Sequence, residues 1–283
     1  MPAIEIRPRR ATELVDAGFQ LLRRYYPQLF TLAAIAMAPS VILRVLMRDS
    51  LSDPTVMVSH PGPAIFISLL AIVCSTIADA VLIVMASDGY LDGAVDPSRS
   101  LGKGMSRLGY VFIASIFRWF IIGSLAVALT VSVPLLTAVH LQVLLIVIVP
   151  VAFWALFYVM LRTFAVSQAV LLEDSGPLEA FGRSLRLSES CGAHVFFTLA
   201  LVWLLYLIAY FVTLGVATAL VTRTIAEIVA GVITVAIYPL VAVVSTLLYY
   251  DLRVRKEGFD LEVMSRELGG DARADGGAPL PAA

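Results

Sequence analysis

The sequence predicts an all-α integral membrane protein with six transmembrane helices. Of its 283 residues, 60% are hydrophobic and 14% are charged, and the mean hydropathy is +0.92. Soluble domains are typically about 45–50% apolar and about 25% charged. Six apolar stretches have the roughly 20 residues that a helix needs to cross a hydrocarbon core of about 30 Å. We therefore expect the lipid bilayer as a partner, and the net charge of −1 argues against nucleic acid.

Short polar segments separate the six predicted spans. The spans are Pro27–Met47, Ala64–Ala86, Tyr110–Val133, Leu141–Leu161, His194–Leu220 and Ile225–Tyr250. Three of them contain a proline, at Pro39, Pro150 and Pro239. Neighbouring helices can satisfy the backbone groups that a proline frees, so we expect kinks there and no breaks.

The chain divides into a membrane domain, residues 1–262, and a cytoplasmic tail, residues 263–283. Residues 269–283, "GGDARADGGAPLPAA", are rich in glycine, alanine and proline. Such a segment cannot bury enough apolar surface to offset the entropy lost on ordering. We therefore expect the tail to be largely disordered.

The spans come in pairs, and a short amphipathic segment precedes each pair. These segments start at Thr12, Asp96 and Gly176, so the spacing is 84 and then 80 residues. Pro97 and Pro177 follow the last two starts, as is common at the first position of a helix. Amphipathic helices of this kind lie in the plane of the bilayer surface. The pattern favours three repeats of an interfacial helix plus a transmembrane hairpin; the alternative is an ordinary six-span protein with amphipathic loops.

Lysine and arginine are concentrated on one side of the predicted spans. Sixteen lie at the two termini and in the loops after the second and fourth spans, and three, Arg44, Arg48 and Arg223, lie on the other side. Short cytoplasmic loops carry the excess of positive charge in membrane proteins. We therefore expect both termini in the cytoplasm and the chain in the inner (cytoplasmic) membrane.

The last span ends in the dense aromatic and charged stretch "LLYYDLRVRKEGFDLE". We interpret Tyr249 and Tyr250 as aromatic-belt residues at the bilayer surface. Three bases would be the positive-inside anchor: Arg253, Arg255 and Lys256. Four acids alternate with them: Asp251, Glu257, Asp260 and Glu262. A simple stop signal would explain the bases alone, whereas a short cytoplasmic helix docked on the bundle would also explain the acids.

Two ionisable residues, Asp79 and Arg118, lie inside predicted spans. A charge at the centre of a membrane helix costs about 2.5–3.5 kcal/mol on insertion scales, and such residues usually face the bundle interior. Each lies roughly 10–12 Å from the cytoplasmic end of its span, at 1.5 Å per residue. We predict a bidentate or water-bridged ion pair. The alternative is that Arg118 snorkels to the interface and Asp79 contacts only Ser75 or Thr76.

The sequence contains no group of residues with the spacing of a catalytic or metal site. The three histidines, His60, His140 and His194, are far apart, and there is no nucleophile elbow or phosphate loop. We interpret Cys74 and Cys191 as free thiols. These observations predict no enzymatic activity, no cofactor and no metal.

Three segments carry a resemblance to a known family. "LLEDSGPLEAFGRSLRLSESCGAHVF" contains a recurrent pattern, here Glu173, Glu179, Ala180, Arg183, Ser184, Leu187 and Ser188. "LLYYDLRVRKEGFDLE" is similar to the C-terminal signature of the family, and "ATELVDAGFQLLRRYYPQLF" is similar to its N-terminal helix. The family is the membrane domain attached to some bacterial glycerophosphoryl diester phosphodiesterases, together with related free-standing membrane proteins of unknown function. The resemblance covers about residues 10–262 and implies a six-helix membrane domain.

The resemblance does not imply an enzymatic activity for this chain. In the family, catalysis belongs to a separate soluble barrel with a His-Glu pair, and this sequence has no such pair. We expect a non-catalytic scaffold or partner module, linked to lipid or envelope homeostasis, whose partner is another membrane or envelope protein. The alternative is a transporter or permease component, on the strength of Asp79, Arg118, the three prolines and the repeat.

Overall fold

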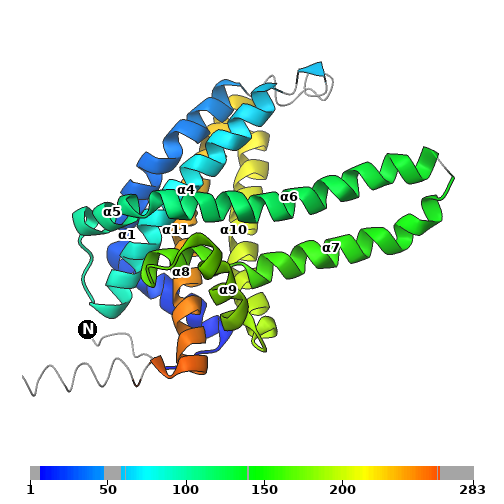
Figure 1. Ribbon diagram of the computed structural model, residues 1–283. Helices are drawn as coiled ribbons and strands as arrows, with labels where there is room; N and C mark the ends of the chain where they lie inside the picture. The colour runs from blue at the N-terminus through cyan, green and yellow to red at the C-terminus, as the bar shows by residue number, and fades with distance from the viewer. Residues whose placement is uncertain (1–6, 48–58, 61, 139, 260, 262–283) are drawn as a thin grey trace, which may run out of the picture.

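The computed structural model describes residues 7–47, 59–60, 62–138, 140–259 and 261 (Figure 1). Every regular element in these ranges is a helix, and six helical segments are long and apolar enough to cross a membrane, which confirms the predicted architecture. The long helices are α1 (Ala11–Leu46), α4 (Gly62–Leu91), α6 (Leu108–Ala138), α7 (Leu145–Arg162), α10 (Gly192–Leu220) and α11 (Arg223–Glu257). The short ones are α5 (Pro97–Ser106), η1 (Gln142–Leu144), α8 (Val166–Leu172), which extends the segment of α7, and α9 (Pro177–Ser188).

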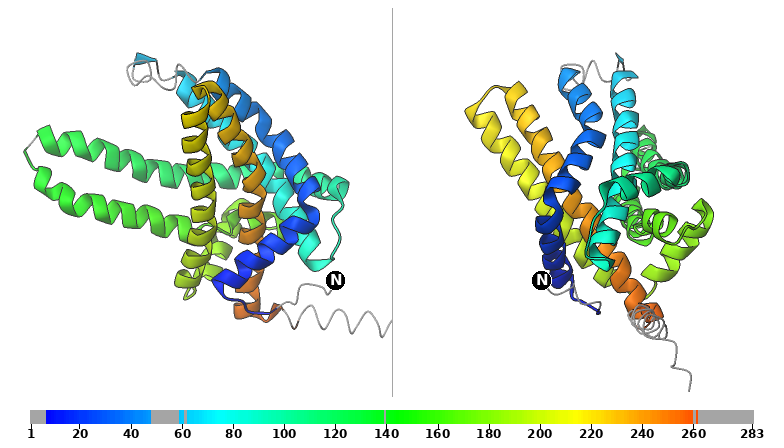
Figure 2. Two further views of the ribbon diagram at one scale, coloured as in Figure 1. Left: turned by 180° about the vertical axis from the view of Figure 1, so that it is seen from behind. Right: turned by 90° about the vertical axis from the view of Figure 1, so that its left-hand side faces the viewer.

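Helices α1, α4, α10 and α11 form a four-helix bundle (Figures 1 and 2). Helix α11 packs against α1, α10 and α4, and α1 packs against α4. Membrane helices associate largely through close van der Waals contact, which small residues permit. Gly231 on α11 provides such a contact, because a Cβ there would lie 2.7 Å from Cγ1 of Val41 on α1.

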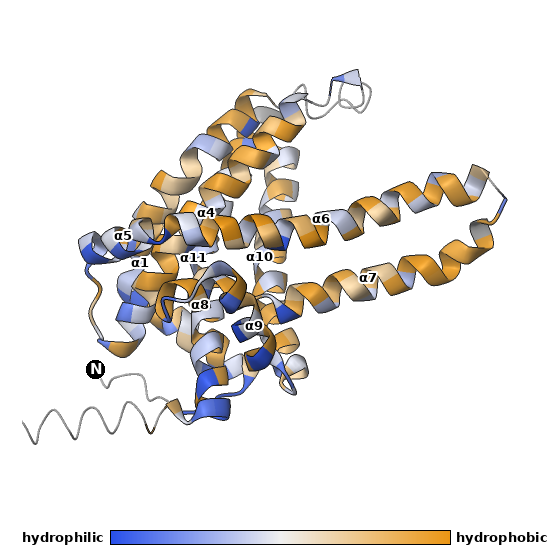
Figure 3. Cartoon of the chain, viewed as in Figure 1, coloured by the Kyte–Doolittle hydropathy of each residue, from blue (hydrophilic) through white to orange (hydrophobic). Residues whose placement is uncertain are grey.

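The α6–α7 hairpin projects sideways from this bundle (Figures 1 and 2). Only its base is packed: the buried residues of α6 are Val111, Ala114 and Ser115, and no described residue of α7 is buried. Figure 3 shows that the projecting part is apolar along most of its length. Phe120, for example, is 73% exposed. The hairpin therefore presents a large apolar surface that the rest of the described chain does not cover.

The long helices run through the three prolines without a break, which confirms that part of the prediction; the kinks expected at these prolines stay a prediction. Pro39, Pro150 and Pro239 all lie inside continuous helices. The backbone of α1 departs from helical geometry at Tyr25, with φ −118° and ψ 19°. Pro27 lies two residues further on and cannot donate the backbone hydrogen bond that a regular helix would need there. Tyr25 thus separates an amphipathic first part of α1 from its membrane-spanning part.

The three amphipathic helices dock through equivalent positions. Their N-caps are Arg10, Asp96 and Gly176, so the last two predicted starts are confirmed and the first lies two residues earlier than Thr12. The fourth and eighth residues after each cap are buried in all three helices: Leu14 and Gly18, Ser100 and Gly104, Ala180 and Ser184. The eighth residue is small in every case, which allows the close approach of another helix.

Each amphipathic helix packs on the second helix of a hairpin. Gly104 of α5 lies against Ala80 of α4. Ser184 of α9 donates a hydrogen bond to the Arg162 carbonyl at the end of α7, at 2.8 Å. Gly18 of α1 lies against Val244 of α11. The last contact joins the first unit to the third, so the three units form a closed ring, and this supports the predicted threefold repeat.

We expect Gly104→Ala to lower the free energy of unfolding by about 1–3 kcal/mol, the usual cost of overpacking. The added Cβ would lie 2.8 Å from the Ala80 carbonyl oxygen, a backbone atom that cannot turn aside. Gly102→Ala in the same helix is the matched control, because its Cβ would meet nothing within 4 Å. Thermal melting in detergent would measure the difference, and equal melting temperatures for the two variants would contradict the packing argument.

Candidate functional site

The aromatic and charged residues that follow the last apolar stretch belong to the same helix, α11. Residues 249–257 remain helical, and Gly258 ends the helix in the left-handed conformation, with φ 64° and ψ 38°. Asp251, Arg253, Arg255 and Lys256 occupy the last turns of α11, so these four residues do not belong to a separate helix. A helix that begins after Gly258 would lie mostly outside the described residues and stays a prediction. Asp260 and the tail lie outside the described residues.

Tyr249 and Tyr250 are only 0% and 3% exposed, so their assignment to an aromatic belt is wrong. The Tyr250 hydroxyl forms a 2.7 Å hydrogen bond with the Ser87 hydroxyl of α4, and its ring stacks on Phe259. The Tyr249 hydroxyl donates to Glu173. Belt tyrosines keep one edge in the headgroup region, whereas both of these rings lie inside the protein with hydrogen-bonded hydroxyls.

The first group of interacting residues at this end, here called the Arg183 cluster, links α8, α9 and α11. Its members are Glu173, Arg183, Tyr249, Arg253 and Glu257. Arg183 donates to both carboxylate oxygens of Glu173, at 2.6 and 2.7 Å, and also to Glu257. Arg253 lies 3.2 Å from Glu257 and 3.6 Å from Glu173. Bidentate arginine–carboxylate contacts are directional as well as strong, so the cluster holds the three elements in one arrangement.

The contacts within the Arg183 cluster shift the pKa values of Glu173 and Arg183. Partial burial acts to raise the pKa of Glu173, but the hydrogen bonds from Arg183 and Tyr249 outweigh it, and the pKa lies below its usual range. The hydrogen bonds that Arg183 makes to Glu173 and Glu257 raise the arginine pKa further. Both groups therefore stay ionised at neutral pH, and their charges stabilise each other.

A second group, here called the Asp251 cluster, joins the two ends of the chain. Its members are Arg9, His194, Asp251 and Arg255. The buried Asp251 carboxylate accepts hydrogen bonds from the Arg9 backbone N–H and from Arg255 Nε, both at 2.6 Å. His194 Nε2 lies 2.8 Å from the same carboxylate, and Arg255 also donates to the Arg9 carbonyl. Because Arg9 immediately precedes the N-cap of α1, these bonds close the ring of three units.

The two clusters contain four of the predicted signature residues: Tyr249, Asp251, Arg253 and Arg255. Lys256 reaches the Arg186 carbonyl of α9 at 3.0 Å, and the Arg253 guanidinium lies 4.2 Å from the centre of the Phe259 ring. In the described ranges, no three His, Cys, Asp or Glu side chains are grouped so that they could hold a metal ion. The acids and bases of the two clusters form hydrogen bonds and ion pairs with one another. The polar end of α11 is therefore suited to join the three units to one another.

Asp79 and Arg118 do not form the predicted direct ion pair. Asp79 accepts a 2.7 Å hydrogen bond from the Tyr238 hydroxyl of α11. Within the described chain, Asp79 and Arg118 form no ion pair within 4.0 Å. The bidentate form is therefore wrong, because α6 turns away from α4 toward the projecting hairpin. The water-bridged form stays a prediction.

Sequence reasoning missed Tyr238 and His194 as partners. Tyr238 offered a signal, since a tyrosine hydroxyl inside an apolar span needs a hydrogen-bond partner. His194 offered no comparable local signal. Its position next to Asp251 depends on the packing of α10 against α11, which no local pattern reports.

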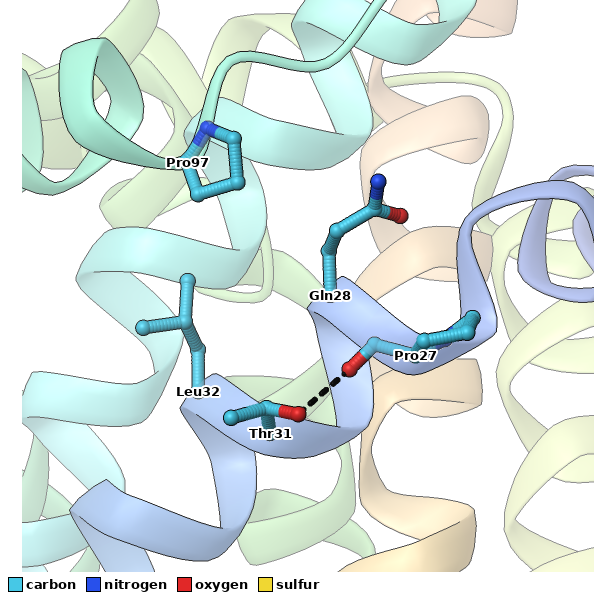
Figure 4. Close-up of a pocket in the computed structure, with 5 residues that line it drawn as sticks. All are labelled: Pro27, Gln28, Thr31, Leu32 and Pro97. Atoms are coloured by element: carbon cyan, nitrogen blue, oxygen red, sulfur yellow. Dashed lines mark hydrogen bonds between the residues drawn. The ribbon is translucent and has the colours of Figure 1, made fainter.

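A shallow pocket of about 350 Å³ lies where α1 bends next to the start of α5 (Figure 4). It is lined by Pro27, Gln28, Thr31, Leu32 and Pro97. The Thr31 hydroxyl donates to the Pro27 carbonyl at 2.6 Å and is therefore already satisfied. None of the lining residues is ionisable, so the pocket offers no acid–base group.

We expect the Glu173→Gln variant to lose less stability than the wild type as the pH is lowered. The lowered folded-state pKa of Glu173 means that its contribution is fully present above the ordinary value of 4.5 and is lost as the pH falls through the lower folded value. The glutamine variant lacks this contribution and should lose less stability than the wild type over that range. Melting temperatures between pH 7 and the acid limit of solubility test this. Parallel profiles would contradict the assigned role of Glu173.

Comparisons with protein-family models, with curated proteins and with solved structures gave no match for this chain. The family resemblance of the three segments stays a prediction. The site is thus described by its own geometry: six apolar helices whose three units are joined by two polar clusters at the end of α11.

Proposed function

We propose that this chain is a non-catalytic multi-spanning scaffold that holds a partner protein in the inner membrane, in the service of lipid or envelope homeostasis. We also propose that it belongs to the membrane-domain family that its three segments resemble. The projecting α6–α7 hairpin carries this proposal. It leaves the bundle as a long apolar element without a covering helix in the described chain.

The rigid base of the hairpin supports the same function. Helix α6 packs at its start against α4, α8 and α9, and α9 is fixed by the Arg183 cluster. A partner that packed along the hairpin would therefore have a fixed position and orientation relative to the four-helix bundle. Contacts of this kind need shape complementarity in the bilayer, since apolar surface alone gives no advantage over lipid.

Photo-crosslinking along the hairpin would test the scaffold proposal. A photoreactive residue at Phe120 or Phe153 should give one protein product at fixed stoichiometry in native membranes. Phe211 on α10 is the matched control, an exposed phenylalanine on the bundle. Products with lipid only, or the same protein products at all three positions, would argue against a dedicated partner surface.

The alternative, a transporter or permease component, draws support from the Asp79–Tyr238 hydrogen bond within the bundle. A carboxylate inside a membrane protein often marks a substrate or ion path. Purified protein in liposomes should show no flux of lipid-derived or amino-acid substrates if the scaffold proposal holds. Flux that Asp79→Ala abolishes would overturn it in favour of transport.

We also propose that both termini face the cytoplasm, from the distribution of lysine and arginine. In a background of Cys74→Ala and Cys191→Ala, a membrane-impermeant thiol reagent should label Ser59→Cys in intact cells. Ser106→Cys, which is exposed on α5, should react only after the cells are opened. The reverse labelling pattern would invert the topology.

A further inference from the structure

Helix α5 packs on the last turns of α4, at the level where the apolar part of α4 ends. At one end of the contact, a Cβ at Gly104 would lie 2.8 Å from the Ala80 carbonyl oxygen. At the other end, the Ser100 hydroxyl donates to the Asp88 carboxylate at 2.9 Å. Between Ala80 and Asp88 the sequence of α4 changes from apolar to polar, over roughly 12 Å at 1.5 Å per residue. The two contacts therefore place α5 beside the boundary between the acyl chains and the headgroups.

One flank of α5 is apolar and remains exposed in this position. Successive residues of a helix are about 100° apart, so residues that are four apart share a flank. Ser100 and Gly104 form the flank that docks on α4 and are both buried. Leu101 and Met105 form the next flank around the helix, and they are 41% and 47% exposed. At the level of the lipid boundary, these two side chains are placed to enter the acyl layer.

The flank on the other side of the docked residues is basic and short of acidic partners. It consists of Arg99 and Lys103, both exposed, and the sequence of α5 contains no acid. The Lys103 ammonium has no hydrogen bond or ion pair with another described residue. Arg99 lies 4.0 Å from Asp92, but the two side chains are 70% and 58% exposed, and pairs of this kind contribute little. Both bases are therefore available to an anion from outside the protein.

The equivalent helix α9 has no such basic flank. Counted from the N-caps, the position of Arg99 in α5 is that of Glu179 in α9, and the position of Lys103 is that of Arg183. Arg183 is already bound to carboxylates within the Arg183 cluster. The two helices thus share a docked flank of small residues but differ in the charge that they offer to the headgroup layer.

We propose that α5 binds anionic phospholipids at this end of the bundle, with Arg99 and Lys103 at the phosphates and Leu101 and Met105 among the acyl chains. Amphipathic helices with bases on the polar face are attracted to anionic lipids. Phosphatidylglycerol keeps a net negative charge, whereas the ammonium of phosphatidylcholine offsets its phosphate. This inference does not depend on the scaffold function, which concerns the α6–α7 hairpin.

The number of bases sets the size of the expected lipid preference. Each lysine or arginine near an anionic bilayer surface favours binding by about fivefold. Two bases therefore predict a preference of roughly twenty-five-fold for phosphatidylglycerol over phosphatidylcholine next to α5. The equivalent position next to α9 should show no preference, because its bases are neutralised or accompanied by acids.

A bimane fluorophore attached at Met105→Cys, in a background of Cys74→Ala and Cys191→Ala, tests the proposal in the full-length protein. The protein is reconstituted in phosphatidylcholine vesicles, and part of the lipid is replaced by phosphatidylglycerol or phosphatidylcholine with brominated acyl chains, which quench nearby fluorophores. The relative binding constant from quenching should be roughly twenty-five-fold higher for phosphatidylglycerol. Leu185→Cys on α9 is the matched control, since Leu185 lies as far from its N-cap as Met105 and is 40% exposed.

Each other outcome contradicts a defined part of the proposal. No quenching at residue 105 by either lipid would place the apolar flank outside the bilayer and overturn the proposal. Equal quenching by the two lipids there, or the same preference at residue 185, would rule out the bases of α5 as its source. Excess soluble glycerophosphoglycerol should leave the quenching unchanged, and a loss would show that the headgroup binds without acyl chains, against the assignment to a lipid.

Variants then assign the preference to the two bases. Lys103→Gln should lower it to about fivefold, and the double variant with Arg99→Gln should abolish it. Arg186→Gln, which removes an exposed base from α9, is the control and should leave the preference at residue 105 unchanged. Melting temperatures should stay the same, because all three side chains are exposed. A preference that survives in the double variant, or that falls equally in Arg186→Gln, would contradict the assigned contacts.

Discussion

Asp251→Ala should lower the free energy of unfolding by about 3–5 kcal/mol, the typical cost of removing one partner from a buried charge pair. Asp251 is 3% exposed and accepts hydrogen bonds from the Arg9 backbone and from Arg255, next to His194. Alanine would leave these donors without their acceptor. Thermal or chemical denaturation in detergent measures the loss.

The same variant should loosen one part of the molecule more than the rest. The Asp251 carboxylate is the acceptor that holds the chain in front of α1 against α11, so its removal should open the amphipathic part of α1 before the bundle unfolds. Hydrogen exchange of residues 11–24 should rise strongly. Asp16→Ala, an exposed acid on the same helix, is the control. Similar exchange in the two variants would show that Asp251 does not hold this segment.

Arg183→Met should lower the free energy of unfolding by about 2–4 kcal/mol. The estimate is below the range for a fully buried pair because the side chains of Arg183 and Glu173 remain 19% and 18% exposed and are partly screened by water. Methionine keeps the apolar stem but leaves Glu173 without its bidentate partner. Unfolding in detergent at neutral pH provides the measurement.

Two comparisons isolate the ionic part of this effect. Arg186→Met removes an exposed guanidinium from the same helix. The contact of Arg186 with Lys256 uses the backbone carbonyl, which the substitution keeps, so the free energy of unfolding should change little. The double variant Arg183→Met with Glu173→Gln should lose less than the sum of the single losses, since the two sites are coupled. Additive losses, or equal losses for Arg183→Met and Arg186→Met, would show that the Arg183 cluster does not join α8, α9 and α11.

Local signals in the sequence were sufficient for the class and for most of the elements. Long apolar stretches identify the six spans because a membrane helix must satisfy its backbone internally over a known length. Asp96 and Gly176, each followed by proline, mark two helix starts that the structure confirms at the residue. The threefold pattern is also visible in the sequence, although the predicted first start, Thr12, lies two residues after the observed N-cap. Measured from the observed N-caps, the small docking residues Gly18, Gly104 and Ser184 recur at the same distance.

The tertiary structure decided which apolar surfaces meet. In water, a helix shows its buried face by its hydrophobic period, but in a bilayer the lipid-facing and protein-facing sides are equally apolar. The sequence therefore contains no local sign that the α6–α7 hairpin leaves the bundle or that Tyr249 and Tyr250 point inward. The hydroxyl of Tyr238 indicates that this residue needs a partner, but not that the partner is Asp79. Those outcomes depend on how closely whole helices pack, which is set by contacts between residues far apart in the chain.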